Sequence, residues 1–231
     1  MSAPIEQSLR GAIRLMSTPD VWVDVRMIAP GDEHALLPDE ARSIASSLVK
    51  VRRASGAARL LGRALLARLG HAACAIPKGA DGAPQWPDGV VGSFAHDGDI
   101  AVAAVARSGD CGAIGIDIEP AEPLPDDLRD LVVTPRERPV LDEDPLRGRV
   151  LFAAKEAVYK AVAARDGLLL DYQDIDVDTA GRRAHLTDGR AVDLRVSVST
   201  HIVVLAMLRD ADLPLPASAE RRKTASTLPA A

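Results

Sequence analysis

The 231-residue chain is poor in aromatic residues, in cysteine and in long apolar runs. Two Trp, two Tyr and two Phe leave a core to be built from Ala, Val, Leu and Ile. The two cysteines, Cys74 and Cys111, have no metal-ligand spacing and exclude a disulfide framework. No apolar stretch approaches the roughly 20 residues of a membrane helix, and no basic lead-in to an apolar run indicates a secretory signal. These absences favour a soluble cytoplasmic protein that does not enter a membrane.

An excess of positive charge is also missing. The 28 Lys and Arg residues are outnumbered by 33 Asp and Glu residues, which gives a net charge of −5. A globally basic nucleic-acid binder is therefore disfavoured. What remains is an ordinary globular composition, 47% hydrophobic and 26% charged, at a length that fits one large domain or two small ones.

The hydrophobic periodicity predicts a helix-rich first part, then strands, one long helix and further strands. We expect helices at 2–15, 38–69 and 146–164, and strands at 21–25, 90–94, 100–106, 113–119, 175–177, 184–186, 191–198 and 201–208. Gly and Pro predict a loop at 77–89, and Thr134-Pro135-Arg136-Glu137 has the pattern of a helix start. The last twenty residues predict a mobile tail. No internal repeat is visible, and this order of elements predicts an α+β fold.

Two carboxylates share one face of the predicted strand Ile114–Glu119. Side chains alternate along a strand, so Asp117 and Glu119 point away from the three isoleucines, with their Cα atoms about 6.6 Å apart. The pair fits either a solvated strand face or a Mg²⁺ site completed by water and a substrate phosphate.

The long predicted helix carries Lys155, Glu156 and Lys160. Lys155 projects only about 40° from Leu151, at the edge of the apolar stripe, so its ammonium must reach solvent or meet an anion. Glu156 and Lys160 are four residues apart, in the favourable order for an ion pair. A solvated pair beside an extended lysine is the alternative to a catalytic cluster.

Histidine and basic residues extend the possible site. His96 stands at the end of a strand, as either a structural residue or a phosphate donor. The remaining cations form either a solubilising surface or a polyanion site: Arg52, Arg53, Arg59 and Lys78. The residues alone therefore favour a Mg²⁺-dependent enzyme that acts on a phosphorylated cofactor.

Three ordered motifs together resemble a known signature. Val90–His96, Gly115–Glu119 and Phe152–Lys160 are similar to the motifs of 4′-phosphopantetheinyl transferases of the surfactin-synthetase-activating type. Lys78-Gly79 and Trp86-Pro87-Asp88-Gly89 favour the bacterial subgroup that contains the enterobactin-synthase activator and the mycobacterial type II enzyme. The resemblance covers about residues 50–172.

The resemblance implies two similar α/β halves related by pseudo-twofold symmetry, with the cofactor in the cleft between them. We assign the halves to residues 1–112 and 113–210, followed by a tail at 211–231. The implied reaction moves the phosphopantetheine arm of coenzyme A to a serine of an apo acyl or peptidyl carrier protein and releases adenosine 3′,5′-bisphosphate. Both halves lie in one chain, so a monomer is expected.

The resemblance also implies roles for single residues. Asp117 and Glu119 match Mg²⁺ ligands, and Glu156 matches a third ligand or the base that activates the serine, with Lys160 beside it. The expected contacts to coenzyme A are Arg52, Arg53, Arg59, Lys78, Gly79, Ala95, His96, Asp117, Lys155, Lys160 and Leu169. The family usually has Ser or Thr before the histidine, so Ala95 removes a hydroxyl contact to phosphate.

Two other classes of protein would share some of these features. A coenzyme A-binding regulator would keep the pocket without transfer, and a Mg²⁺-dependent phosphohydrolase would use water in place of the serine. A regulator would be favoured by the loss of a motif acid, and all three acids are present.

Overall fold

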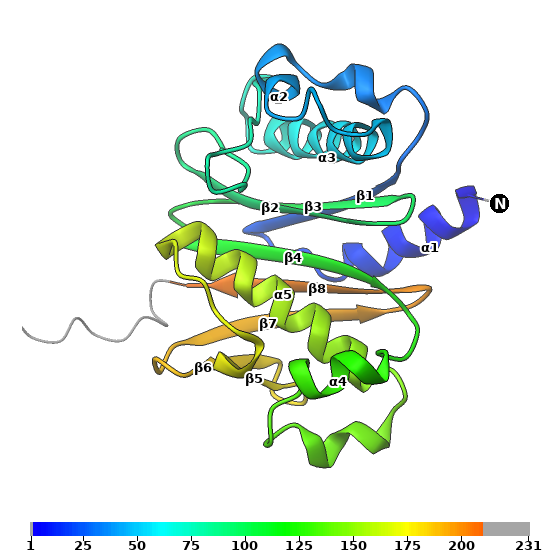
Figure 1. The fold of residues 1–231 in the computed structure, drawn as a ribbon. Coiled ribbons are helices and arrows are strands. Elements are labelled where there is room, and N and C mark those ends of the chain that lie inside the picture. Colours follow the sequence, from blue (N-terminus) through cyan, green and yellow to red (C-terminus); the bar gives the residue numbers. More distant parts are fainter. Residues whose placement is uncertain (1, 210–231) are drawn as a thin grey trace, which may run out of the picture.

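The computed structural model describes residues 2–209, which form four layers in the order helix, sheet, sheet, helix (Figure 1). The predicted α+β class is confirmed. None of the helices in this part of the chain is long and apolar enough to cross a bilayer. The tail predicted at 211–231 lies outside the described residues.

The first half of the chain forms a three-stranded antiparallel sheet in the order β1-β3-β2. Leucines of the long helix α3 cover one face of this sheet, and α1 packs against the other side. The elements are α1 (Ser2–Arg14), β1 (Val21–Met27), η1 (Asp32–Ala35), α2 (Pro38–Arg42), α3 (Val49–Arg68), β2 (Val90–Asp97) and β3 (Ile100–Arg107).

The second half forms a five-stranded sheet in the order β4-β8-β7-β6-β5, again with antiparallel neighbours. The long helix α5 covers its outer face, and its inner face packs on the first sheet. The elements are β4 (Ala113–Pro120), α4 (Asp126–Val132), η2 (Arg138–Glu143), α5 (Arg147–Asp166), η3 (Tyr172–Asp174), β5 (Ile175–Asp178), β6 (Arg183–Leu186), β7 (Ala191–Val198) and β8 (His201–Leu208).

The two halves repeat one topology. In each, a strand is followed by a long helix and two further strands, and the last strand lies between the other two: β1-β3-β2 and β4-β8-β7. The hairpin β5–β6 is an addition to the second half. The expectation of two similar α/β halves is therefore confirmed.

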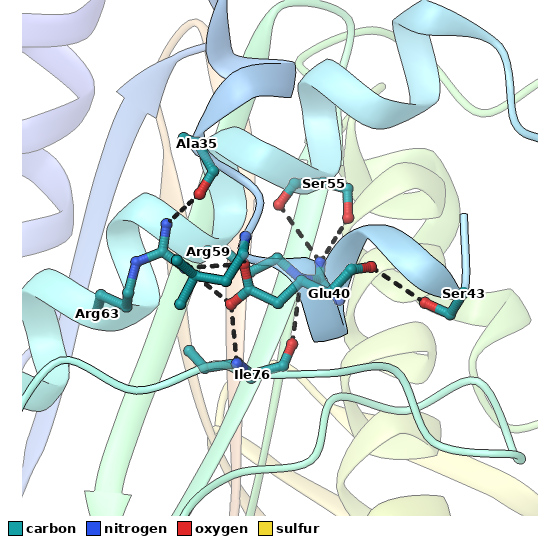
Figure 2. Close-up of polar contacts among 8 residues, drawn as sticks. Ala35, Glu40, Ser43, Ser55, Arg59, Arg63 and Ile76 are labelled. Atoms are coloured by element: carbon teal, nitrogen blue, oxygen red, sulfur yellow. Dashed lines mark hydrogen bonds and ion pairs between the residues drawn. The ribbon is translucent and has the colours of Figure 1, made fainter. Parts of the chain in front are cut away.

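A buried carboxylate holds the first half together (Figure 2). Glu40 is fully buried and accepts hydrogen bonds from Arg63 of α3, at 2.8 and 2.9 Å, and from the backbone N–H groups of Leu37 and Ile76, at 2.8 Å each. Arg63 also donates to the carbonyl of Ala35 at 2.7 Å. One side chain thus fastens the segment before α3 and the segment after it to the helix.

Glu137 repeats this arrangement in the second half. It accepts from Lys155 of α5 at 2.8 Å, from the N–H of Thr134 at 2.8 Å and from the N–H of Val177 at 2.7 Å. Lys155 also donates to the carbonyl of Val132 at 2.7 Å, five residues before the glutamate, as Ala35 is before Glu40. The sequences Leu-Pro-Asp-Glu at 37–40 and Thr-Pro-Arg-Glu at 134–137 are therefore equivalent turns, an internal repeat that the sequence alone does not reveal.

Two predicted helices differ from the structure. The helix expected over 38–69 is two helices, because the chain turns between Arg42 and Val49 to bring Glu40 under α3. The helix start expected at Thr134 is a turn followed by the short helix η2. There the Thr134 hydroxyl donates to Asp176 at 2.6 Å rather than capping a helix.

Gly115 sets how closely α5 approaches β4. A Cβ at this position would lie 1.8 Å from the carbonyl oxygen of Ala157, so only glycine permits the contact. The isoleucines at 114, 116 and 118 pack into the core between the sheets, which confirms the predicted alternation and turns Asp117 and Glu119 toward α5.

We expect Gly115→Ala to lower the free energy of unfolding by about 3 kcal/mol or more, because backbone on both elements must move apart. Urea denaturation followed by circular dichroism measures this loss. Gly109→Ala is the matched control, since no described atom lies within 4 Å of its Cβ position, and should change stability by less than about 0.5 kcal/mol. Equal effects of the two substitutions would contradict the close contact.

Candidate active site

Asp117 is the centre of a cluster between β4 and α5. Its side chain is buried, and its Oδ1 atom accepts from the ammonium of Lys160 at 2.6 Å. Lys160 also donates to the backbone oxygen of Ile116 at 3.2 Å. The Oδ2 atom of Asp117 is buried and has no hydrogen-bond partner among the described residues. Burial raises the pKa of Asp117, and the charge of Lys160 opposes this shift.

Glu119 lies two residues further along the same face of β4. Its Oε2 atom accepts from Arg149 of α5 at 3.0 Å. Burial, and next the negative charge of Asp117, raise the pKa of Glu119 to about 7. Arg149 also donates to the backbone oxygens of Glu122 and Pro123, so it ties the loop after β4 to the helix. No local sequence pattern marks Arg149, because its partners become neighbours only when α5 docks on β4.

Glu156 faces a pocket of about 450 Å³ that Leu169, Leu170 and Tyr172 also line. Leu169 is 79% exposed at the edge of this pocket. The hydroxyl of Tyr172 donates to the Oε1 atom of Glu156. Burial first, and then this hydrogen bond, raise the pKa of Tyr172. Tyr172, like Arg149, is marked by no local sequence pattern, because Glu156 lies 16 positions before it.

The donor atoms of Asp117, Glu119 and Glu156 have the chemistry that a hard cation prefers. The free Oδ2 atom of Asp117 is the buried oxygen without a partner that such a cation would satisfy. The negative charge of Glu156 contributes to the raised pKa of Asp117, so Glu156 lies within electrostatic range of Asp117. In residues 2–209, however, no three His, Cys, Asp or Glu side chains converge as a metal cluster. Each of the three acids has a partner within the protein: Lys160, Arg149 or Tyr172.

Lys155, which we expected to face a phosphate, makes its polar contacts within the second half of the protein. It is fully buried, and its ammonium contacts Glu137 at 2.8 Å and donates to the backbone oxygens of Val132 at 2.7 Å and Tyr172 at 3.0 Å. Of the two alternatives that its position on the helix left open, solvent or an anion, the structure shows an anion, the Glu137 side chain. Three acceptors of the protein thus surround its ammonium, and Lys155 also lines the 450 Å³ pocket beside Glu156.

A second pocket, of about 230 Å³, gathers residues expected to bind coenzyme A from the first half. Arg59, Lys78, Ala95 and His96 all line it. Partial burial, and next the positive charge of Lys160, lower the pKa of His96. His96 therefore lies within electrostatic range of the acidic cluster on the other half.

The three arginines of the first half differ in what holds them. Arg59 is buried, with its Nε atom donating to Ile76 at 3.1 Å and its Nη1 atom to the Ser55 hydroxyl at 2.6 Å (Figure 2). Arg53 is paired with Glu33 through two contacts, of 2.9 and 3.2 Å. The Nε atom of Arg52 is buried without a described partner.

The loop with Gly79 lies beside these residues. Gly79 donates its N–H to Ala83 at 2.8 Å, and an isolated bridge joins Lys78 to Pro84. Gly79 itself lines a separate crevice that reaches Ile114 and Ala164 of the second half. The loop thus stands over the junction between the two halves.

The fold and site describe a duplicated α/β protein with an acidic cluster in its second half and a pocket with basic side chains in its first half. Residues 39–106 match the 4′-phosphopantetheinyl transferase N-terminal domain, and residues 113–206 match the 4′-phosphopantetheinyl transferase superfamily. The chain is 38% identical to the 4′-phosphopantetheinyl transferase Npt of Nocardia iowensis, over 77% of this chain and 79% of that protein. This protein therefore belongs to the 4′-phosphopantetheinyl transferase superfamily.

Two further relatives are similar over shorter spans. The 4′-phosphopantetheinyl transferase Svp of Streptomyces mobaraensis is 41% identical over 64% of this chain, and PptT of Mycobacterium tuberculosis is 40% identical over 54%. The matched region spans 63% of Svp and 57% of PptT. A solved holo-[acyl-carrier-protein] synthase of Thermotoga maritima has 19% identity over 42% of this chain and 62% of its own, with a TM-score of 0.35.

We expect Glu137→Ala to lower the free energy of unfolding by about 3–5 kcal/mol, since Lys155 would stay buried without its counter-ion. The exposed Glu122 supplies the control, because Glu122→Ala removes an acid from the same half without uncovering a buried charge. Chemical denaturation of both variants measures the difference. Wild-type stability of Glu137→Ala would contradict the buried ion pair between Lys155 and Glu137.

Proposed function

We propose that this protein transfers the 4′-phosphopantetheine arm of coenzyme A to a serine of an apo acyl or peptidyl carrier protein. The observation that carries the proposal is the acidic cluster itself: a free Asp117 oxygen, Glu119 and Glu156 beside Lys160, in a chain of this superfamily. Acids and a cation beside a second cationic pocket suit the cleavage of a pyrophosphate.

Glu156 is the proposed general base. A serine hydroxyl is a weak nucleophile until a positioned carboxylate accepts its proton. The serine oxygen then bonds to the phosphorus that carries the pantetheine arm. The bond from that phosphorus to the bridging oxygen breaks, and adenosine 3′,5′-bisphosphate leaves with the electron pair. Lys160, beside Asp117, is proposed to stabilise the charge that develops on the pyrophosphate.

Asp117 and Glu119 are the residues that would hold Mg²⁺, with Glu156 as a further oxygen donor. When bound, Mg²⁺ would neutralise pyrophosphate charge and polarise the bond that breaks. Asp117 has the buried free oxygen for this role, and Arg149 keeps Glu119 turned toward the same side.

The two pockets suit the two ends of coenzyme A. Arg59, Lys78 and His96 would bind the 3′-phosphate through charge-assisted hydrogen bonds, and the N–H of Ala95 is the remaining donor where the family usually has a hydroxyl. Arg52, with its buried Nε atom free, is a further candidate. Leu169 and Leu170 give the Glu156 pocket an apolar wall that suits the pantetheine arm.

Mass spectrometry of an apo carrier protein incubated with the protein, coenzyme A and Mg²⁺ tests the function. We expect the carrier to gain one phosphopantetheine group and adenosine 3′,5′-bisphosphate to appear in equal amount. Cleavage of coenzyme A without a carrier would identify a phosphohydrolase, and binding without either product would identify a regulator.

We expect Asp117→Asn to lower transfer by about a hundredfold or more and to weaken Mg²⁺ binding measured by calorimetry, because one ligand charge is lost. Asp110→Asn serves as the control, since Asp110 is an exposed turn residue and should keep both properties. Transfer by the Asp117 variant within a few-fold of wild type at ordinary Mg²⁺ would refute the metal assignment.

We expect Arg59→Ala to weaken the binding of coenzyme A more than that of dephospho-coenzyme A, which lacks the 3′-phosphate. A hydrogen bond to a charged group contributes about 1.5–3 kcal/mol, so the ratio of the two dissociation constants should change by at least about tenfold. Calorimetry with both ligands measures it. Equal losses would mean that Arg59 acts only through its bonds to Ser55 and Ile76.

A further inference from the structure

Tyr172 is held against α5 at three points. Its hydroxyl donates to Oε1 of Glu156, and its backbone oxygen accepts from the ammonium of Lys155 at 3.0 Å. Its ring lies against Phe152, with 5.8 Å between the ring centroids. The hydroxyl, the backbone and the ring are thus each engaged by a different residue of the helix that carries the proposed base.

The lysine that binds the backbone oxygen of Tyr172 is itself held in place by Glu137. Lys155 is fully buried and bound to Glu137 at 2.8 Å, and Glu137 also accepts from the N–H of Val177 at the following strand. Glu137, Lys155, Tyr172 and Glu156 therefore form a continuous series of polar contacts. It begins at the buried turn of the second half and ends at the carboxylate in the pocket.

We propose that Tyr172 is a positioning residue for Glu156, an inference that rests on the proposed function. A glutamate side chain has three rotatable bonds, and an exposed carboxylate samples several orientations. The hydroxyl of Tyr172 holds the Oε1 atom of Glu156 by a hydrogen bond and makes no such bond to the Oε2 atom. If the Glu156 carboxylate is held in one orientation, a larger fraction of bound complexes has the base placed to accept the serine proton. The hydrogen bond should therefore raise the rate of transfer and leave the affinity for the substrates unchanged.

The substitution Tyr172→Phe removes only the hydroxyl and therefore tests its hydrogen bond to Glu156. The variant keeps the ring that packs on Phe152 and the backbone oxygen that accepts from Lys155, so the fold of this segment is preserved. We expect kcat for transfer to fall about tenfold, while the KM values for coenzyme A and the carrier protein change by less than about twofold.

Glu156→Ala supplies the test of mechanism. If Tyr172 acts through Glu156, adding Tyr172→Phe to Glu156→Ala should cause no further loss of kcat beyond about twofold. A further tenfold loss in that background would show that the hydroxyl acts elsewhere, and an unchanged kcat in the single variant would show that it does not act. Either result would overturn the positioning role.

A stability measurement, which needs no enzymatic activity, tests the contact between Tyr172 and Glu156 separately from the proposed transferase function. In urea denaturation, the midpoint shifts of Tyr172→Phe and Glu156→Ala should sum to more than the shift of the double variant, because both remove the same hydrogen bond. If the midpoint shifts of the two single variants add up to that of the double variant, the hydrogen bond between Tyr172 and Glu156 does not contribute to stability. That result would overturn the positioning role even if the enzyme is active. Failure of the wild-type protein to transfer phosphopantetheine would overturn the proposed function, and with it the positioning role, whatever the midpoints show.

Discussion

The contact between Gly115 of β4 and the backbone of Ala157 is the constraint on which the site depends. The absence of a side chain lets α5 lie directly on the strand, at a distance that no other residue allows. Lys160 is thereby brought to 2.6 Å from Asp117, and Arg149 to 3.0 Å from Glu119. If α5 lay further from β4, Lys160 and Arg149 could not reach Asp117 and Glu119.

The buried carboxylates of Glu40 and Glu137 give the duplicated fold its rigidity. Each fixes a long helix to the segment before it and the segment after it, using the same pattern of one side-chain cation and two backbone N–H groups. Such groups are costly to bury unless every bond is made, so the two turns must fold in one arrangement. The second turn also connects to the site, because Lys155 holds Tyr172 and Tyr172 holds Glu156.

Much of the architecture could be predicted where a local pattern is strong. The alternation in Ile114–Glu119 correctly placed the isoleucines on one side and the acids on the other. The position of Lys155 beside the apolar stripe left open whether its ammonium reaches solvent or meets an anion, and the anion that it meets, Glu137, lies 18 positions earlier. The expected continuous helix over 38–69 and the helix start at Thr134 were wrong, because Glu40 and Glu137 bond across the fold and bend the chain at both turns.

The sequence by itself determined the α+β class, the strand that presents Asp117 and Glu119, and the helix that carries Glu156 and Lys160, because these depend on periodicities of two and 3.6 residues. Only the tertiary structure decided which cation meets which acid. Arg149, Tyr172 and Glu137 contact partners 30, 16 and 18 positions away, and Arg53 pairs with Glu33, 20 positions away. Pairings of this kind depend on how α3 and α5 dock on their sheets, and that docking is set by packing between distant segments, which no local pattern records.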